Sequence, residues 1–524
     1  MYRPDKPAVP ALCWSLIWLL GFAVLVLVSI RFADGHLVYT LDDPYIHLSV
    51  AENILHGGYG VNAQENSSPS SSVLFPLLLA PFVWLGWGRA AALIINTIAT
   101  GLSVWLLLRF YWERAVGAKG SRIFPHLISA LLILSINAFA LPMTGMEHSL
   151  HVLLVAVTIT GLVELAETNR ASPLLLAAIV LMPFVRFEGL ALSFATTLAM
   201  GLLGRARAAI ALALAIVVLF LAYGLVMNRL GLPFFPSSVL VKSNVAASAA
   251  GGGGGFVAAS LDNLRHSLDD RWGIVFAFFV CFTLVKLRSA DHQRAKPEFV
   301  LAVVSGLSIA AHLIAGRYDW FHRYEVYAVA IVVFSLLYFE RERLRRLMQG
   351  ELLRREALVL GLLAFISPYL TATVLTPYAS RAIYDQQFQM HRFATAFFPR
   401  PVAVNDLGWV SFENDNFVLD LWGLGSEKVR KLRAAGRFDT NAMAAIVAQA
   451  NIDYAMIYEP WFDGIVPKSW LRVAVLESEP VSAAYGRVSF YATRPSVCAE
   501  LSGALDRFAP TLPAGVHLTR FACE

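Results

Sequence analysis

Charged residues are scarce in this chain, and their scarcity narrows the class of protein. Of 524 residues only 15% are charged while 57% are hydrophobic, and the mean hydropathy is +0.60. Soluble domains carry more charge, so the composition indicates a polytopic membrane protein. The formal net charge is +5, but no dense basic tract of the kind that binds nucleic acid occurs, and we exclude that class.

Cysteine is rare as well, and several motifs for metal and phosphate chemistry are missing. The chain has four cysteines, none in a CxxC pair, and it contains no HExxH and no glycine-rich phosphate loop. We therefore predict no metal centre and no cofactor, with dependence on a divalent ion left open. Cys498 and Cys523 both follow the last apolar run, and we expect them to form a disulfide if that part lies in an oxidising compartment.

Apolar runs long enough to cross a bilayer recur up to about residue 376, and we expect about eleven membrane spans. The first run is too long for a signal peptide, so we interpret it as a retained span. Residues 73–87 are apolar but short and rich in tryptophan at their end, which predicts an interfacial or re-entrant helix. The expected spans are 11–31, 90–108, 124–143, 149–165, 172–185, 189–203, 208–228, 273–287, 298–315, 325–339 and 356–376.

Basic residues select one orientation for these spans. If residues 73–87 do not cross, one set of loops collects nearly all of the clustered arginine and lysine, as the positive-inside rule requires. The N-terminus is then cytoplasmic and the C-terminus extracytoplasmic. Five polar motifs fall on the outer face under this topology: Asp42-Asp43, Glu147-His148, Arg186-Phe187-Glu188, Lys242 and Asp319-Trp320-Phe321-His322-Arg323. The pattern predicts an active site at the outer membrane surface.

The adjacent acids Asp42 and Asp43 are the most informative of these motifs. Pro44 suits the first turn of a helix, which we expect to run from about Tyr45 to His56. One acid can serve as the N-cap, but a cap does not require two. A carboxylate at a helix N-terminus stays ionised, as a general base must. We predict that one of the two acids is the base, and the sequence leaves open which.

The other motifs also have plain structural interpretations. Glu147, Arg186 and Glu188 could pair or cap helices at the membrane interface. Lys242 is either a solvated charge or a ligand for a lipid phosphate. Arg323 and its neighbour His322 could hold the same phosphate or form an ion pair with Asp319.

Beyond Pro377 the composition changes, and residues 377–524 are long enough for a separate domain. Short β-rich runs alternate there with helical patterns, which predicts a small extracytoplasmic α/β domain. The expected strands lie at 402–405, 417–421, 454–458 and 488–492, and the clearest helix at 441–450. Residues 1–376 would form the transmembrane catalytic domain, with 32–88 as a first outer loop that carries interfacial helices.

Taken together, the motifs resemble those of the GT-C superfamily of integral-membrane glycosyltransferases, and most closely its bacterial branch of terminal-arabinofuranosyltransferase type. The ordered set spans most of the membrane region. It consists of Asp42-Asp43-Pro44-Tyr45-Ile46, Ala51-Glu52-Asn53-Ile54-Leu55, Gly58-Tyr59-Gly60, Thr144-Gly145-Met146-Glu147, Arg186-Phe187-Glu188-Gly189, Pro236-Ser237-Ser238 with Lys242, and Asp319-Trp320 with Arg323-Tyr324. Arg-Phe-Glu-Gly stands for the family's Arg-Pro-Glu-Gly and Pro-Ser-Ser for its Pro-Asn-Thr, which leaves the sugar open.

The resemblance implies transfer of a sugar, with inversion, from a polyprenyl-phosphate donor to a glycan, lipid or protein acceptor. The enzyme would lie in a bacterial inner membrane among its lipids. Asp42 or Asp43 would be the base. The residues assigned to substrate binding are Tyr45, Glu147, His148, Arg186, Glu188, Lys242, Asp319, His322 and Arg323, of which Lys242 and Arg323 are the main candidates for the phosphate.

Two other functions compete with this interpretation. A transporter or flippase of lipid-linked sugars would break no bond, but transporters place their ionisable residues near the bilayer midplane. Here the ionisable residues stand at the outer ends of the spans. The second of these functions is that of an envelope-assembly protein whose C-terminal domain acts without catalysis.

Overall fold

The computed structural model describes residues 8–116, 123–250, 255–289, 296–318, 320–349 and 352–523. The chain forms two compact units, each built from three segments that are distant in sequence. The helical unit contains Met1–Val26, Leu93–Ala222 and Gly251–Val374. The mixed unit contains Leu27–Ala92, Tyr223–Ala250 and Leu375–Glu524. Four long helices pass from one unit into the other: α1 (Ala8–Phe32), α4 (Gly88–Ala115), α10 (Ala206–Arg229) and α18 (Leu352–Asp385).

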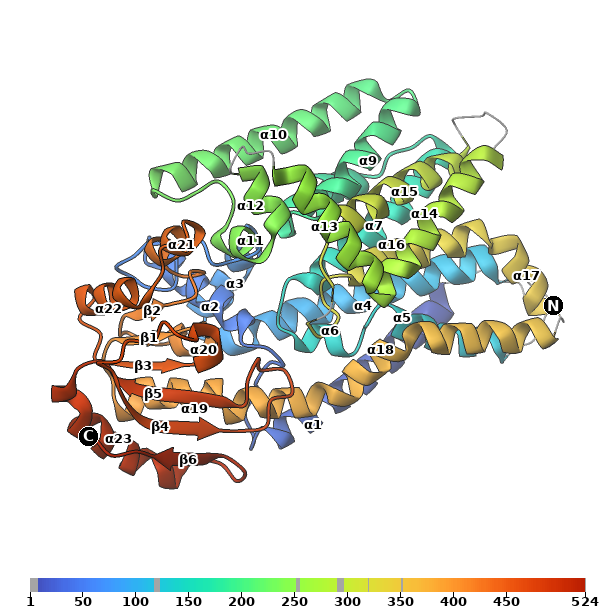
Figure 1. The fold of residues 1–524 in the computed structure, drawn as a ribbon. Helices are drawn as coiled ribbons and strands as arrows, with labels where there is room; N and C mark the ends of the chain where they lie inside the picture. The colour runs from blue at the N-terminus through green and yellow to red at the C-terminus, as the bar shows by residue number, and fades with distance from the viewer. Residues whose placement is uncertain are drawn as a thin grey trace. The chain divides into compact units, whose positions relative to one another are not determined.

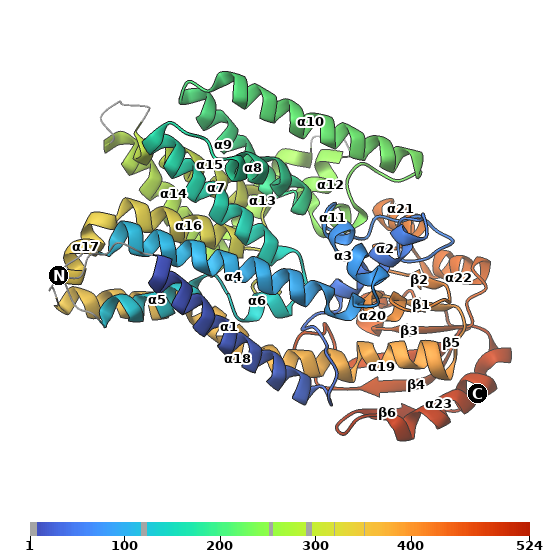
Figure 2. The ribbon, with the colours of Figure 1, turned by 180° about the vertical axis from the view of Figure 1, so that it is seen from behind.

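The helical unit is a bundle of helices (Figure 1), most of which are apolar. Its remaining helices are α5 (Phe124–Ser135), α6 (Ala140–Met143), α7 (His148–Thr168), α8 (Pro173–Val185), α9 (Gly189–Leu202), α13 (Gly255–Asp269), α14 (Arg271–Ser289), α15 (Pro297–Ala315), α16 (Val326–Phe339) and α17 (Arg341–Gln349). Within the unit α7 packs against α8 and α16, and α15 packs against α9, α14 and α16 (Figure 2). Thirteen of the 14 residues of α16 are buried, so this helix forms the centre of the bundle.

Eight helices in the described part of the chain are long and apolar enough to cross a membrane. They coincide with eight of the expected spans, and the expected spans at 172–185, 189–203 and 325–339 correspond to the shorter helices α8, α9 and α16. Residues 73–87 form only the ten-residue helix α3 (Phe75–Trp84), too short to cross. The predicted class, a many-helix membrane protein with a C-terminal α/β domain, is confirmed, and the count of eleven spans stays a prediction.

The mixed unit is organised around a six-stranded sheet with the order β2-β1-β3-β5-β4-β6, visible as neighbouring arrows in Figure 1. Its strands are β1 (Val402–Val404), β2 (Val418–Asp420), β3 (Tyr454–Ile457), β4 (Leu471–Glu477), β5 (Arg487–Ala492) and β6 (His517–Arg520). Strand β1 pairs in parallel with β2 and β3, whereas the pairs β3–β5, β4–β5 and β4–β6 are antiparallel. The four predicted strands are confirmed, and β4 and β6 were not foreseen.

Helices cover both faces of this sheet, because its strands are apolar on both sides. Val402 and Val404 face one core, which includes residues of α19 (Gln387–Arg392), the π-helix η1 (Phe393–Phe397) and α23 (Cys498–Phe508). Ala403, between them, faces the other core, which includes residues of α21 (Glu427–Ala434) and α22 (Thr440–Gln449). The shorter elements of the unit are α11 (Ser237–Lys242), α12 (Asn244–Ala250), α20 (Gly408–Ser411) and the 3-10 helices η2 (Glu459–Phe462), η3 (Pro495–Val497) and η4 (Ala509–Thr511).

The first loop packs into the same unit as the sheet. Helix α2 (Asp43–Leu55) contributes Ile46 and Val50 to the core that contains α23. The Asn62 side chain then pairs with edge strand β2, since its amide donates to the Val418 carbonyl (2.9 Å) and accepts from the Val418 N–H (2.8 Å). Further on, the Ser237 N–H at the start of α11 donates to the Ser68 carbonyl (2.9 Å). The first loop is therefore a structural part of the mixed unit.

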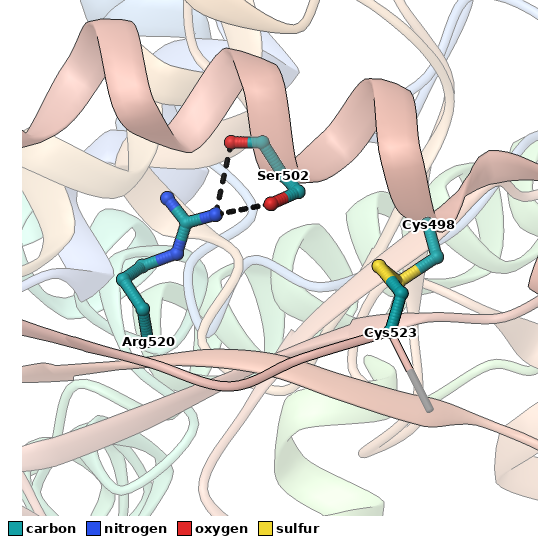
Figure 3. The surroundings of a disulfide bond; sticks show 4 residues. All are labelled: Cys498, Ser502, Arg520 and Cys523. Carbon is teal, nitrogen blue, oxygen red and sulfur yellow. Dashed lines mark hydrogen bonds between the residues drawn. A yellow bond between two sulfur atoms is a disulfide. The ribbon is translucent and has the colours of Figure 1, made fainter.

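A disulfide joins Cys498, at the start of α23, to Cys523, with 5.9 Å between their Cα atoms (Figure 3). The expected pairing is therefore present. Arg520 on β6 adds a second connection, because its Nη2 donates to the carbonyl (3.0 Å) and the hydroxyl (2.5 Å) of Ser502 on α23. The end of the chain is thus bound to α23 at two points.

Removing this disulfide should destabilise the mixed unit. Replacing both cysteines by alanine frees a cross-link that closes a loop of 25 residues, and chain-entropy arguments put the loss at about 3 kcal/mol. Thermal unfolding of the full chain with and without reductant measures the effect. Alanine at the exposed free cysteines Cys13 and Cys281 is the matched control and should change nothing. Unfolding that is insensitive to reductant would contradict the prediction.

Candidate functional site

The mixed unit contains an acid site at the start of α2. Asp42 occupies the N-cap position but makes no side-chain capping bond. Its carboxylate instead accepts hydrogen bonds from the backbone N–H groups of Gly408 (2.6 Å) and Trp409 (2.8 Å), which begin α20. The Asp42 side chain therefore does not cap α2. Asp42 is an anchor that binds the first loop to the C-terminal sequence.

Gly408 is required for this contact because the two segments approach closely. A Cβ atom at this position would lie 2.0 Å from the Asp42 carbonyl oxygen and 2.6 Å from its Oδ2. Both neighbours are held by other bonds, so neither can move away cheaply. Only glycine fits here without displacing the first loop.

Gly408→Ala should therefore lower the free energy of unfolding by about 1–3 kcal/mol, the range for overpacking a tight interior. The shift should appear as a lower melting temperature of the purified chain in detergent. Gly503→Ala on α23 is the matched control, because its Cβ would meet nothing closer than 4.0 Å. If both variants melt together, the approach of Asp42 to Gly408 is looser than described.

A second buried acid, Asp406, lies beside Asp42. Its Oδ2 accepts hydrogen bonds from the Gln387 side-chain amide (2.8 Å) and the Tyr458 hydroxyl (3.0 Å). Burial raises the pKa of Asp42 well above its ordinary value, the negative charge of Asp406 raises it further, and the two backbone N–H groups only partly offset this. Burial likewise raises the pKa of Asp406, against the hydrogen bonds that it accepts. The two carboxyl groups are hydrogen-bonded neighbours, and the pair is best satisfied when it holds one proton.

This pair should make stability depend on pH. The native pKa values lie above the unfolded value near 4, so the folded chain keeps a proton that the unfolded chain has released. Stability is then greatest in acid and falls as pH rises above about 4. Asp406→Asn supplies a permanent donor to Asp42 and should flatten this slope. The stability of the variant relative to the parent should therefore increase as pH rises. Melting temperatures from pH 4 to pH 8 test this, with exposed Asp506→Asn as control; parallel curves for parent and variant would refute it.

Asp43 differs from Asp42 in its surroundings. It is the first residue of α2 and is partly exposed, whereas Asp42 is only 7% exposed. The charge of Asp43 acts on both Asp42 and Asp406, so the three carboxyl groups form one cluster. Tyr45, one turn further on, is fully buried, accepts from the Tyr39 N–H (3.1 Å) and stacks on Trp409 with 3.9 Å between ring centres. Tyr45 therefore supports the backbone that anchors Asp42.

The helical unit contains a second polar cluster, built from the two tight turns between its helices. Arg186, which ends α8, bonds to Glu147 at the start of α7 (2.7 Å) and to Glu188 at the start of α9 (2.6 Å). Glu147 is fully buried and Arg186 is 6% exposed. Two motifs separated by 39 residues therefore meet as an ion pair, which agrees with the structural interpretation of these residues, and their role in substrate binding stays a prediction.

A third motif reaches this cluster through the ring of Tyr324. The guanidinium groups of Arg186, Arg317 and Arg323 lie 5.7, 5.2 and 4.9 Å from its centre. Arg323 is 1% exposed and donates to the Tyr324 hydroxyl (3.0 Å). His148 contacts the same ring edge-on. We call Arg186, Arg317 and Arg323, with the residues that they contact, the arginine cluster. Three arginines around one aromatic ring form an arrangement suited to an anionic group. Arg317 was not predicted from the sequence.

The loop before Tyr324 has unusual backbone geometry. Trp320, Phe321 and His322 all have positive φ angles, of 54°, 67° and 55°. The left-handed region costs a non-glycine residue about 1–2 kcal/mol, and such segments concentrate at binding sites. His322 is held by Glu325 (3.0 Å), whereas Trp320 is 47% exposed. The loop thus presents an aromatic side chain at the surface beside the arginine cluster.

Two histidines that continue the arginine cluster into the bundle were also not predicted from the sequence. His151 stacks on Tyr327 with 4.4 Å between ring centres, and His312 lies 2.8 Å from the Tyr327 hydroxyl. Both lie inside helices whose apolar pattern gave no indication that polar rings would meet. They extend the polar cluster from the turn into the bundle.

Two predicted site residues cannot be placed: Asp319 and the side chain of Lys242, which ends α11, lie outside the described residues. The other predicted residues gather in two places. Asp42, Asp43 and Tyr45 belong to the acid site of the mixed unit. The predicted residues that belong to the arginine cluster of the helical unit are Glu147, His148, Arg186, Glu188, His322 and Arg323. Among the described residues, no three His, Cys, Asp or Glu side chains are arranged to hold a metal.

The fold and the two clusters define a polytopic membrane protein with a C-terminal α/β domain and polar sites at its helix ends. A family model described as a domain of unknown function (DUF8728) matches residues 380–491. No curated protein matches the chain.

Three solved structures are similar to most of the chain. ArnT from Cupriavidus metallidurans, bound to undecaprenyl phosphate, is 13% identical over 91% of this chain and 98% of its own, with a TM-score of 0.45. The oligosaccharyltransferase of Archaeoglobus fulgidus, in complex with Zn and sulfate, is 11% identical over 95% and 75%, with a TM-score of 0.43. The mycobacterial arabinofuranosyltransferase AftD is 15% identical over 92% and 41%, with a TM-score of 0.38.

Proposed function

We propose that the chain is a membrane glycosyltransferase of GT-C type that transfers a sugar from a polyprenyl-phosphate donor to a glycan, lipid or protein acceptor. The observation that carries the proposal is the difference in hydrogen bonding and exposure between the adjacent acids. Asp42 is committed to two backbone N–H groups, and Asp43 is partly exposed at the N-terminus of α2. A base needs access to its substrate, so we assign that role to Asp43.

In this mechanism the Asp43 carboxylate accepts the proton of the acceptor hydroxyl. The hydroxyl oxygen attacks the anomeric carbon as the bond from that carbon to the phosphate oxygen breaks, so the configuration inverts. The polyprenyl phosphate leaves with the bonding electron pair. Asp42 holds the start of α2 in place, and a proton shared with Asp406 limits the buried pair to one negative charge. A fixed base of this kind contributes about 100- to 10,000-fold to the rate.

The leaving phosphate needs cationic partners, and we propose Lys242 and Arg323 for this role. Arg186 is less suited, because two carboxylates already neutralise it. The guanidinium groups of Arg323 and Arg317 both lie over the Tyr324 ring, which makes Arg317 an additional candidate. In the proposed topology these groups act at the outer face of a bacterial inner membrane, with residues 377–524 as the extracytoplasmic domain.

Purified full-length chain incubated with a panel of polyprenyl-phosphate sugars and a mixture of membrane glycan acceptors tests the proposal. A transferase consumes one donor selectively and releases free polyprenyl phosphate in equal amount to the glycosylated acceptor. Movement of intact lipid-linked sugar across liposomes without release of polyprenyl phosphate would overturn the proposal in favour of a flippase.

A further inference from the structure

A groove on the helical unit shares no lining residue with either polar cluster. It has a volume of about 710 Å³ and is formed by α4, α7 and α8. This volume is within the range of about 300–1,000 Å³ that holds small ligands. Most of its lining is apolar and comes from membrane-spanning helices, for example Leu102 and Leu106 of α4, Leu153 and Val157 of α7, and Leu181 of α8. The interior of the groove therefore suits a hydrocarbon chain.

One end of the groove is charged. Arg109, Glu113 and Arg114, near the end of α4, line it together with Glu164 and Glu167, near the end of α7. Two ion pairs organise these groups, since Arg109 bonds to Glu113 (2.7 Å) and Arg114 bonds to Glu167 through both guanidinium nitrogens (2.6 and 2.7 Å).

The fifth charged group, Glu164, has no cation in ion-pair contact anywhere in the described chain. The mouth of the groove therefore carries three carboxylates against two guanidinium groups. An exposed carboxylate at the edge of an apolar groove is favourable for a ligand that brings a positive charge to it.

We propose that this groove binds one membrane phospholipid with a phosphoethanolamine head group. One acyl chain lies along the apolar walls, which suit a hydrocarbon chain. The ammonium donates hydrogen bonds to Glu164, and the phosphate lies toward Arg109, whose side chain is 46% exposed. An anionic head group would bring more negative charge to a mouth that already has an excess of it, and a phosphocholine head has no N–H to donate.

Native mass spectrometry of the full-length chain tests the proposal. The protein is delipidated in detergent and then titrated with phosphatidylethanolamine, phosphatidylcholine and phosphatidylglycerol of identical acyl chains. The expected result is one tightly bound phosphatidylethanolamine, with at least about tenfold weaker binding of the other two, a factor equal to 1.4 kcal/mol. Equal retention of all three lipids, or preferred phosphatidylglycerol, would overturn the proposal.

Two variants separate the groove from the general membrane surface. Ala177→Trp places an indole in the groove from an exposed position on α8 and should abolish the tightly bound lipid. Ala211→Trp, equally exposed on α10 and outside the groove, is the matched control and should retain it. Glu164→Gln should keep a bound lipid but reduce the preference for ethanolamine over choline about tenfold. Unchanged lipid binding in Ala177→Trp would place the lipid elsewhere and refute the assignment.

Discussion

Replacing Asp43 by asparagine should slow sugar transfer by about 100- to 10,000-fold, the usual contribution of a general base. The amide is nearly isosteric with the carboxylate but cannot accept the acceptor's proton. Because Asp43 is partly exposed at the N-terminus of α2, its loss should leave the fold and donor binding largely intact. Single-turnover rates with a saturating lipid-linked donor measure the effect. Normal turnover in this variant would remove Asp43 from catalysis.

Asp42→Asn is the matched comparison and should fail in a different way. An asparagine offers one acceptor oxygen where Asp42 offers two, so one of the N–H groups of Gly408 and Trp409 loses its partner or meets an amide donor. The expected cost is about 1–3 kcal/mol of stability, the penalty for an unsatisfied buried donor. The melting temperature should therefore fall in Asp42→Asn and not in Asp43→Asn. The opposite result would exchange the roles of base and anchor.

Arg186→Leu should be severely destabilising, by about 3–5 kcal/mol. This guanidinium is the partner of both Glu147, which is fully buried, and Glu188. Its removal leaves a buried carboxylate beside a second one without compensation, and burying an uncompensated charge is costly. The loss should appear as a lower thermal midpoint and poor recovery of folded chain from the membrane.

Two further variants keep this prediction specific. Arg186→Lys restores the charge but not the planar fork that reaches two carboxylates, so it should recover only part of the loss. Arg343→Leu breaks the ion pair with Glu340 at the surface, where the Arg343 side chain is 80% exposed. Exposed pairs contribute about 1 kcal/mol or less, so this variant should melt near the parent. Equal effects of Arg186→Leu and Arg343→Leu would show that the ion pairs of Arg186 contribute no more to stability than an ordinary surface pair.

Much of the fold was predictable because it depends on local pattern. The length of apolar runs was enough for the eight long helices, and the break at Gly57 and Gly58 was enough to end α2 near His56. Strands β1, β2, β3 and β5 were found because they are short β-branched or aromatic runs between turn residues. Strand β4 contains Arg472 and ends at Glu477, and β6 begins at His517 and ends at Arg520. Because of these polar residues, neither strand stood out as an apolar run.

The candidate site was predictable in its residues but not in its grouping. Motif positions at span ends identified Glu147, Arg186 and Glu188, and their ion pairs follow from opposite charges in neighbouring turns. Arg317 was missed because a lone arginine after a span is usually a solvated charge. His151 and His312 were missed because nothing local distinguishes a helix histidine with a polar partner from one in a core.

By itself, the sequence determined that this is a membrane protein with many helices, an acid pair after its first span and a C-terminal α/β domain. These conclusions rest on composition and on patterns within about twenty residues. Only the tertiary structure decided which of the two acids is an anchor. That distinction depends on hydrogen bonds between Asp42 and residues 366 and 367 positions away, and on a glycine whose missing side chain allows the approach. No local pattern encodes a contact of that range, because it is selected by the packing of the whole mixed unit.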